Sequence, residues 1–179
     1  MGKHMQNFDI DRTTRARGGA RLRVEAPART VWGKLTGLAD WPRWNRAVTR
    51  MAVSDPVRVG TEFRWTAGGL PIRSRIEALD EGRRFVGWTG TAPLLGARHV
   101  YRLAEHDGAT LVETEESFSG PLARLLPDLC SRMIVSSLEQ GLAVRSAALD
   151  VLEVGGCEVG ALVAADHQSP LRTRREFDL

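Results

Sequence analysis

His99 and Tyr101 lie two residues apart in residues 97–103, which alternate in polarity like a strand with one buried face. This alternation predicts that both side chains point inward. An imidazole in an apolar interior can act as a general acid or base near neutral pH, and a phenol can orient a carbonyl group or supply a proton. The same pattern fits a core histidine hydrogen-bonded to its surroundings and a tyrosine that only forms a wall.

Glu116 shares the inward parity of Val112 and Thr114 in the next alternating stretch, residues 111–118. A buried carboxylate needs a partner or a proton, and His99 on the preceding strand is the neighbour that we expect. A Glu–His pair can abstract a proton or assist a dehydration. It can equally be a structural bridge between two strands, so both interpretations remain open.

Apolar and small polar side chains at inward positions predict the wall of an internal pocket. Five tryptophans in one small domain favour a flat, apolar or aromatic ligand, because indole rings offer large rigid contact surfaces. The same side chains can simply fill a core, and the alternation does not decide whether Phe85 or Trp88 points inward. The predicted ligand-binding residues are Trp44, Phe63, Trp65, Ser74, Trp88, Phe118, Leu129, Met133 and Ser137.

Other kinds of site find little support in the sequence. Only His99 of the four histidines is placed inside, so we predict no metal site. Gly68 and Gly69 precede a strand and not a helix, which argues against a dinucleotide-binding loop. No base is spaced to activate Ser74 or Ser137 as a nucleophile, which argues against a hydrolase triad. We expect no cofactor.

Length and charge indicate one domain with no nucleic-acid partner. The chain has 179 residues, and its net charge of +3 divides into +4 in residues 1–23, −1 in residues 24–160 and zero in residues 161–179. A nucleic-acid-binding domain concentrates basic charge on its folded body, whereas here the surplus lies in what we expect to be a solvated arm.

The two cysteines form no disulfide framework, and neither a signal peptide nor a membrane span is predicted. We expect a cytoplasmic monomer or homodimer that does not insert into membranes.

Three parts of the chain are predicted. Residues 1–5 resemble residues added by an expression vector, and residues 1–18 comprise this remnant and a basic arm. Residues 19–153 form the domain, and residues 154–179 form a tail with weak periodicity.

The order of elements predicts an α+β fold with a curved antiparallel sheet. We expect a strand at 20–26, a helix at 28–35, a helical turn at 38–44, alternating strands from Val48 to Phe118, and a long helix from Pro121 to about Glu153. Its apolar stripe includes Leu129 and Met133, while Cys130 lies beside the stripe as a small core residue. A twisted sheet of six to seven strands curls, and only the long helix can cover its apolar face, which leaves a gap that forms a pocket.

Four segments carry a resemblance to a known family: VEAPARTVWGKLTGLADWPRWN, GLPIRSRIEALDEGRRFVGWTGT, ARHVYRL and VETEESFSGPLARLL. With the order of elements, they resemble the polyketide cyclase/dehydrase and lipid-transport family of the START-like (Bet v 1-like, helix-grip) superfamily, over about residues 19–153. The resemblance implies an apolar ligand between sheet and helix. Superfamily members include aromatase/cyclases, other lyases and isomerases, plain carriers, and proteins of no assigned activity.

Three functions follow from this reading. The first is a cofactor-independent cyclase or dehydratase acting on a polyketide-like substrate, with His99, Glu116 and Tyr101 as catalytic residues. The second is a non-catalytic carrier or sensor of a hydrophobic ligand, such as a lipid or an aromatic metabolite. The third is a scaffold domain with a solid core.

Overall fold

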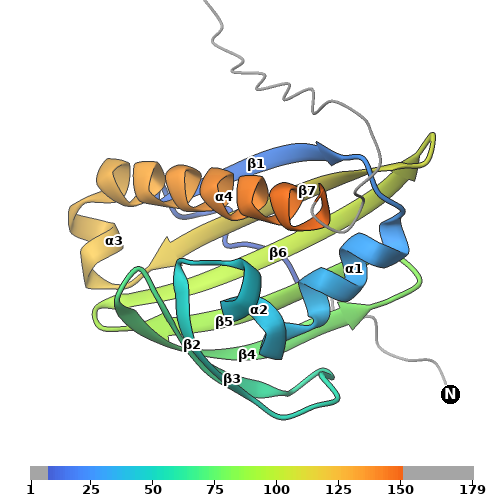
Figure 1. Cartoon of the computed structure of the whole chain (residues 1–179). Coiled ribbons are helices and arrows are strands. Elements are labelled where there is room, and N and C mark those ends of the chain that lie inside the picture. Colours follow the sequence, from blue (N-terminus) through green and yellow to red (C-terminus); the bar gives the residue numbers. More distant parts are fainter. Residues whose placement is uncertain (1–7, 151–179) are drawn as a thin grey trace, which may run out of the picture.

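A computed structural model describes residues 8–150, with side chains described as far as residue 141. Seven antiparallel strands form one curved sheet in the order β1-β7-β6-β5-β4-β3-β2, and helices cover its concave face (Figure 1). The strands are β1 (Arg17–Val24), β2 (Val48–Val53), β3 (Glu62–Ala67), β4 (Leu70–Asp80), β5 (Phe85–Ala92), β6 (Leu95–His106) and β7 (Ala109–Ser119). The helices are α1 (Ala28–Thr36), the 3-10 turn η1 (Leu38–Asp40), α2 (Trp41–Trp44), α3 (Pro121–Leu125) and α4 (Pro127–Asp150). The predicted fold class is confirmed, whereas the tail at 154–179 and the vector-like residues 1–5 lie outside the described residues.

Tight turns and irregular pairing give the sheet its shape. Gly68 and Gly69 take φ values of 55° and 82° between β3 and β4, and Asp107 and Gly108 take 51° and 77° between β6 and β7. Positive φ at both central residues matches the right-handed twist of a two-residue hairpin. The β4–β5 pairing shifts register between Ile76 and Ala78. Such a bulge bends its strand and increases the local twist, which curves the sheet.

The prediction of one long helix from Pro121 to about Glu153 is wrong in one respect, because the structure has two helices there, α3 and α4. Leu126 separates them with a φ of −132°, outside the helical region. Pro127 is the reason, since a proline disfavours helical backbone in the residue before it and is well suited to begin a helix. None of the helices within the described residues is long and apolar enough to cross a membrane.

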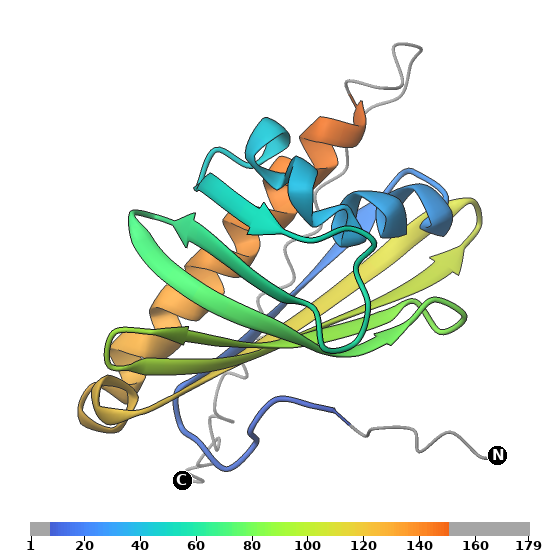
Figure 2. The same cartoon turned by 90° about the horizontal axis from the view of Figure 1, so that it is seen from below.

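Helix α4 lies along the edge of the sheet, over β1 and β7 (Figures 1 and 2). Its buried side chains are Cys130, Ile134 and Leu138. Gly18 of β1 allows the close approach, because a Cβ there would lie 2.8 Å from Cγ2 of Val135. The burial expected for Cys130 is confirmed.

The side of α4 predicted to pack inward is not the side that packs. Leu129 and Met133 are 44% and 47% exposed, whereas the stripe that contains Cys130 contacts the sheet. The small side of α4 that contains Cys130 can approach Gly18 of β1 closely. The bulkier side chains of Leu129 and Met133 would hold the helix further from the strand. The alternation of apolar types along the helix cannot distinguish two neighbouring stripes of similar apolarity.

Residues 8–12 pack against the convex face of the sheet, on the side away from α4 (Figure 2). Residues 15 and 16 lie beside α4, because the carbonyl oxygen of Arg15 accepts a hydrogen bond from Ser131 and Ala16 packs with Cys130. Ile10 and Ala16 are buried, and the Arg98 guanidinium lies 4.5 Å from the centre of the Phe8 ring. The expectation of a solvated arm is therefore wrong for these residues. Gly87 contributes to this packing, because a Cβ there would overlap the Phe8 ring.

Two arginines and two carboxylates fix this segment to the sheet. Arg12 contacts Asp9 and Glu115 at 3.0 Å each, and Arg102 contacts Glu115 at 2.8 Å and Asp9 at 3.1 Å. Burial raises the pKa of Glu115, but hydrogen bonds and the charges of Arg12 and Arg102 outweigh it and hold that pKa below its usual value. The pKa of Asp9 is also lowered, because its hydrogen bonds outweigh the opposing effect of burial.

Replacing Glu115 with Gln tests this network. We expect E115Q to lower the free energy of unfolding by about 1 kcal/mol at pH 7, because two charge-assisted contacts are lost. A carboxylate with a lowered folded-state pKa stabilises the fold above its unfolded pKa, here about 4.5, and loses this contribution as pH falls through the folded value. Urea unfolding from pH 3 to pH 7 should show the difference between wild type and E115Q shrinking towards acid.

Glu113→Gln is the matched control. Glu113 lies on the same face of β7, two residues away, and pairs only with the exposed Arg21. E113Q should cost a few tenths of a kcal/mol at most. Equal losses in the two variants would contradict the role given to the network.

Candidate functional site

Three rings from two neighbouring strands form the centre of the concave face. His99 pairs directly with Trp88 in the β5–β6 register, and the two ring centres are 4.7 Å apart. Tyr101 stacks on His99 at 4.7 Å with an interplanar angle of 19°, and lies 5.6 Å from Trp88. This answers the question that the alternation left open, since Trp88 points inward. Phe85 lies on the outer face, under the guanidinium of Arg102.

Both nitrogen atoms of His99 face side chains of β7. Nε2 lies 2.7 Å from Oγ1 of Thr114, and Nδ1 lies 3.5 Å from Oε1 of Glu116, the residue directly opposite in the register. The His99 and Glu116 side chains are 10% and 14% exposed. The expected His99–Glu116 neighbourhood is thus present. Such a pair can hold a proton and exchange it with a bound molecule, and it can also link two strands.

Trp41 completes the aromatic cluster, and the sequence analysis did not include it. Its ring centre lies 5.6 Å from Trp65, 5.8 Å from Trp88 and 6.2 Å from Trp44. Its Nε1 donates a hydrogen bond to the carbonyl oxygen of Leu35 at 3.1 Å. The spacing of Trp41 and Trp44 in LADWPRW was an available signal, but a four-residue helix has no periodicity from which to decide which ring turns inward.

Several predicted ligand-binding residues contribute to this packed core. Phe63 is 1% exposed and lies 6.4 Å from both Trp65 and Trp88. The Ser74 hydroxyl accepts a hydrogen bond from Nε1 of Trp65 at 3.1 Å. Trp44 is half-buried beside them at α2. The part of the interior below α1 and α2 is therefore filled by side chains.

The other predicted residues lie towards α4. Phe118 packs in a second cluster with Cys130 and Ala123. Ser131 donates a hydrogen bond to the carbonyl oxygen of Arg15, and Val135 packs near Gly18, so one side of α4 faces β1. With about 3.6 residues per turn, the opposite side faces the middle of the sheet. That side carries Met133 and Ser137, with Leu129 next to it. Leu126 directly precedes the helix, and all four side chains are exposed.

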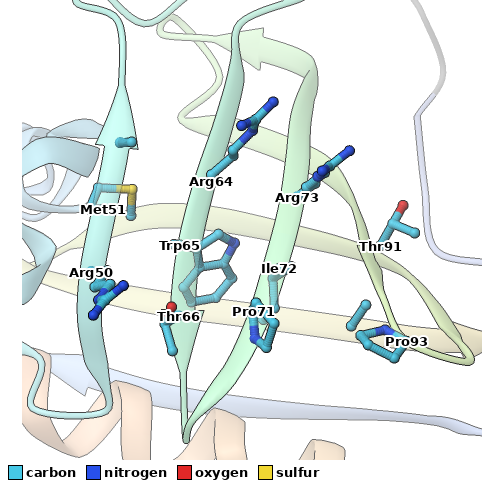
Figure 3. Close-up of a pocket in the computed structure, with 12 residues that line it drawn as sticks. Arg50, Met51, Arg64, Trp65, Thr66, Pro71, Ile72, Arg73, Thr91 and Pro93 are labelled. Carbon is cyan, nitrogen blue, oxygen red and sulfur yellow. The ribbon is translucent and has the colours of Figure 1, made fainter.

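The hollows found at the surface lie elsewhere. One of them, about 840 Å³, is bordered by β2, β3, β4 and the turn after β5, and its lining includes Trp65 but neither His99 nor Glu116 (Figure 3). Within residues 8–141, no three histidine, cysteine or acidic side chains gather in a way that could hold a metal ion.

The sheet, the long C-terminal helix and the interior between them define a helix-grip protein. A family model described as polyketide cyclase / dehydrase and lipid transport matches residues 17–144. The chain belongs to this family. No curated protein matches it in sequence.

Solved structures agree on the fold. A START superfamily protein from Mycobacterium smegmatis has a TM-score of 0.66 and 12% identity, over 76% of this chain and 98% of its own. The ZhuI aromatase/cyclase from Streptomyces sp. R1128 has a TM-score of 0.65 and 19% identity, over 79% and 98%. The di-domain aromatase/cyclase BexL of the BE-7585A biosynthetic pathway has a TM-score of 0.66 and 16% identity, over 78% and 48%. At these identities the likeness concerns the fold alone.

Substituting Trp41 tests whether it organises the interior. Trp41→Ala removes a fully buried indole and its hydrogen bond, and should cost about 3–5 kcal/mol of unfolding free energy. Trp44→Ala, three residues along in α2, removes a half-buried ring and should cost clearly less. Urea denaturation followed by circular dichroism measures both. Similar losses would contradict the central position assigned to Trp41.

Proposed function

We propose that this protein binds an apolar, flat small molecule between α4 and the concave face of the sheet, and that it is a cofactor-independent enzyme of the cyclase or dehydratase type. One observation carries the proposal: the His99–Glu116 pair lies among aromatic rings on the concave face, the floor of the proposed site, with Thr114 beside His99. Family membership and the aromatase/cyclase neighbours support the choice of a hydrophobic, polyketide-like substrate.

The apolar side chains around this floor supply the binding energy. Leu129 and Met133 on α4, and Leu126 just before it, are exposed without a covering element among the described residues. Each such side chain gains about 1.5–3 kcal/mol when it is fully buried. A flat ligand lying between this row and the rings of the floor buries apolar surface on both of its faces. The same contacts keep water away from the reacting atoms.

The His99–Glu116 pair supplies the acid–base chemistry of the proposal. As a base, the pair takes a proton from a carbon between two carbonyl groups. The resulting enolate carbon bonds to a second carbonyl carbon and closes a ring, and the proton returns to the alkoxide. Removal of a further carbon-bound proton with loss of hydroxide, protonated to water, completes the dehydration. Holding the chain in a folded shape supplies much of the rate enhancement.

A carrier is the second candidate, and a specific observation favours it. Nε2 of His99 is already hydrogen-bonded to Thr114, and Tyr101 is only 2% exposed. Groups held in this way can serve as a rigid floor against which a hydrophobic ligand packs. In that case the protein catalyses no reaction, and substitution of His99 or Glu116 changes no reaction rate.

Binding is tested with a neutral fluorescent probe, N-phenyl-1-naphthylamine. Met133→Lys should weaken probe binding at least about tenfold, because the lysine charge would have to be desolvated beside the probe. Glu139→Lys places a lysine at another exposed position of α4, about 120° around the helix from Met133, and should leave the affinity unchanged. Equal affinities for M133K and wild type would place the ligand elsewhere.

Catalysis is tested with Glu116→Gln, which preserves shape and removes the carboxylate. Ring closure of a synthetic poly-β-ketone thioester should slow by about 10²–10⁴-fold, as is typical when a general base is lost. Probe affinity should not change. Glu113→Gln, on the other face of β7, should match wild type. An unchanged rate in E116Q, together with intact probe binding, would favour the carrier.

A further inference from the structure

Three arginines gather on the outer face of the sheet at the hollow of about 840 Å³. Arg50, Arg64 and Arg73 come from the neighbouring strands β2, β3 and β4. They alternate along these strands with Met51, Trp65 and Ile72. Met51 and Trp65 pack against the core. The arginines therefore lie on the face away from the proposed ligand site. Figure 3 shows Arg64 and Arg73 side by side and pointing in the same direction.

These three arginines differ from all the others on the strands. Each of the six other strand arginines has an acceptor in the structure: Arg17, Arg21, Arg23, Arg75, Arg98 and Arg102. Within the described part of the chain, Arg50, Arg64 and Arg73 have no ion pair and no hydrogen bond from their guanidinium groups. Among the described residues, no carboxylate lines this hollow. Glu62 lines an adjoining hollow together with Arg64 and Arg73, but it forms no ion pair with the three arginines. The three positive charges therefore lack an ion-pair partner among the described residues.

The register makes this arrangement unfavourable without a ligand. Arg64 and Arg73 are directly opposite each other in the β3–β4 pairing. Their Cβ atoms are then about 5 Å apart on the same face, and like charges at such a position destabilise a sheet. An anion between them would turn the repulsion into attraction.

The geometry of the hollow suits a phosphate group on an organic molecule. A phosphate dianion has enough acceptor oxygens for several guanidinium groups, which bind it through paired, charge-assisted hydrogen bonds. The Thr91 hydroxyl lies in the same hollow as a further donor. The volume of about 840 Å³ exceeds what one phosphate needs and falls in the range of sites for small molecules. Pro71 and Pro93 offer apolar surface to the rest of the ligand.

We propose that Arg50, Arg64 and Arg73 form a binding site for a phosphorylated small molecule on the outer face of β2–β4, separate from the internal site. The site is independent of the proposed catalytic or carrier function, because its side chains point to the opposite side of the sheet.

Phenyl phosphate is the probe for this site. Isothermal titration calorimetry at constant ionic strength should show binding to wild type and at least about tenfold weaker binding to the double variant Arg64→Gln, Arg73→Gln, since each charge-assisted contact is worth at least that factor. The melting temperature of the double variant should be unchanged or raised, because a like-charge contact has been removed. Binding of N-phenyl-1-naphthylamine should be unaffected.

The double variant Arg21→Gln, Arg23→Gln is the control. It removes the same charge from β1, at the opposite edge of the sheet, and should bind phenyl phosphate like wild type. Equal weakening in both double variants, or no binding to wild type at millimolar probe, would overturn the proposal. A fall in melting temperature in the first variant would do so as well, because the arginines would then be structural. A single-stranded oligonucleotide that binds wild type more tightly than phenyl phosphate does, and that the Arg64→Gln, Arg73→Gln variant does not bind, would overturn the proposal of a small ligand in favour of a nucleic acid.

Discussion

The indole of Trp41 packs between α2 and the concave face of the sheet and fills this part of the interior. It contacts Trp65 and Trp88 below α2, and its one polar atom is hydrogen-bonded to the backbone of Leu35. Because this part is packed with rings, the ligand site proposed above lies on the side of α4. The partly exposed Glu116 and the exposed Met133 lie on that side. Trp41 thus stabilises the core and also occupies the part of the interior below α2.

The position of α4 depends on small residues at its contact with β1. Gly18 and Cys130 allow the helix to approach the sheet closely, and Pro127 sets the residue at which it begins. Together they fix the rotation of the helix about its own axis. The larger apolar residues of the helix are consequently left on its exposed sides. A helix rotated by one residue would bury Leu129 and Met133 and would close the space that the proposed ligand occupies.

The two faces of the sheet handle charge differently. Inside, the carboxylate of Glu116 lies beside His99. Outside, the arginines of β1, β6 and the later half of β4 are matched by acceptors, several of them in residues 8–16 and β7. Arg50, Arg64 and Arg73 are the exception. The separation of functions between an apolar interior and a charged exterior follows from the period of two along each strand.

The resemblance of four segments indicated the family. The alternating pattern of the sequence by itself determined the succession of strands along the chain and the inward positions of His99, Tyr101 and Glu116. Each depends on neighbours along one strand or across one hairpin, which local periodicity and turn residues specify. The sequence did not reveal the inward position of Trp41, the buried stripe of α4 or the packing of residues 8–16. Those depend on which surfaces fit against each other across the fold, and only the tertiary structure decided them, because small residues such as Gly18 and Gly87 act through contacts with segments distant in the chain.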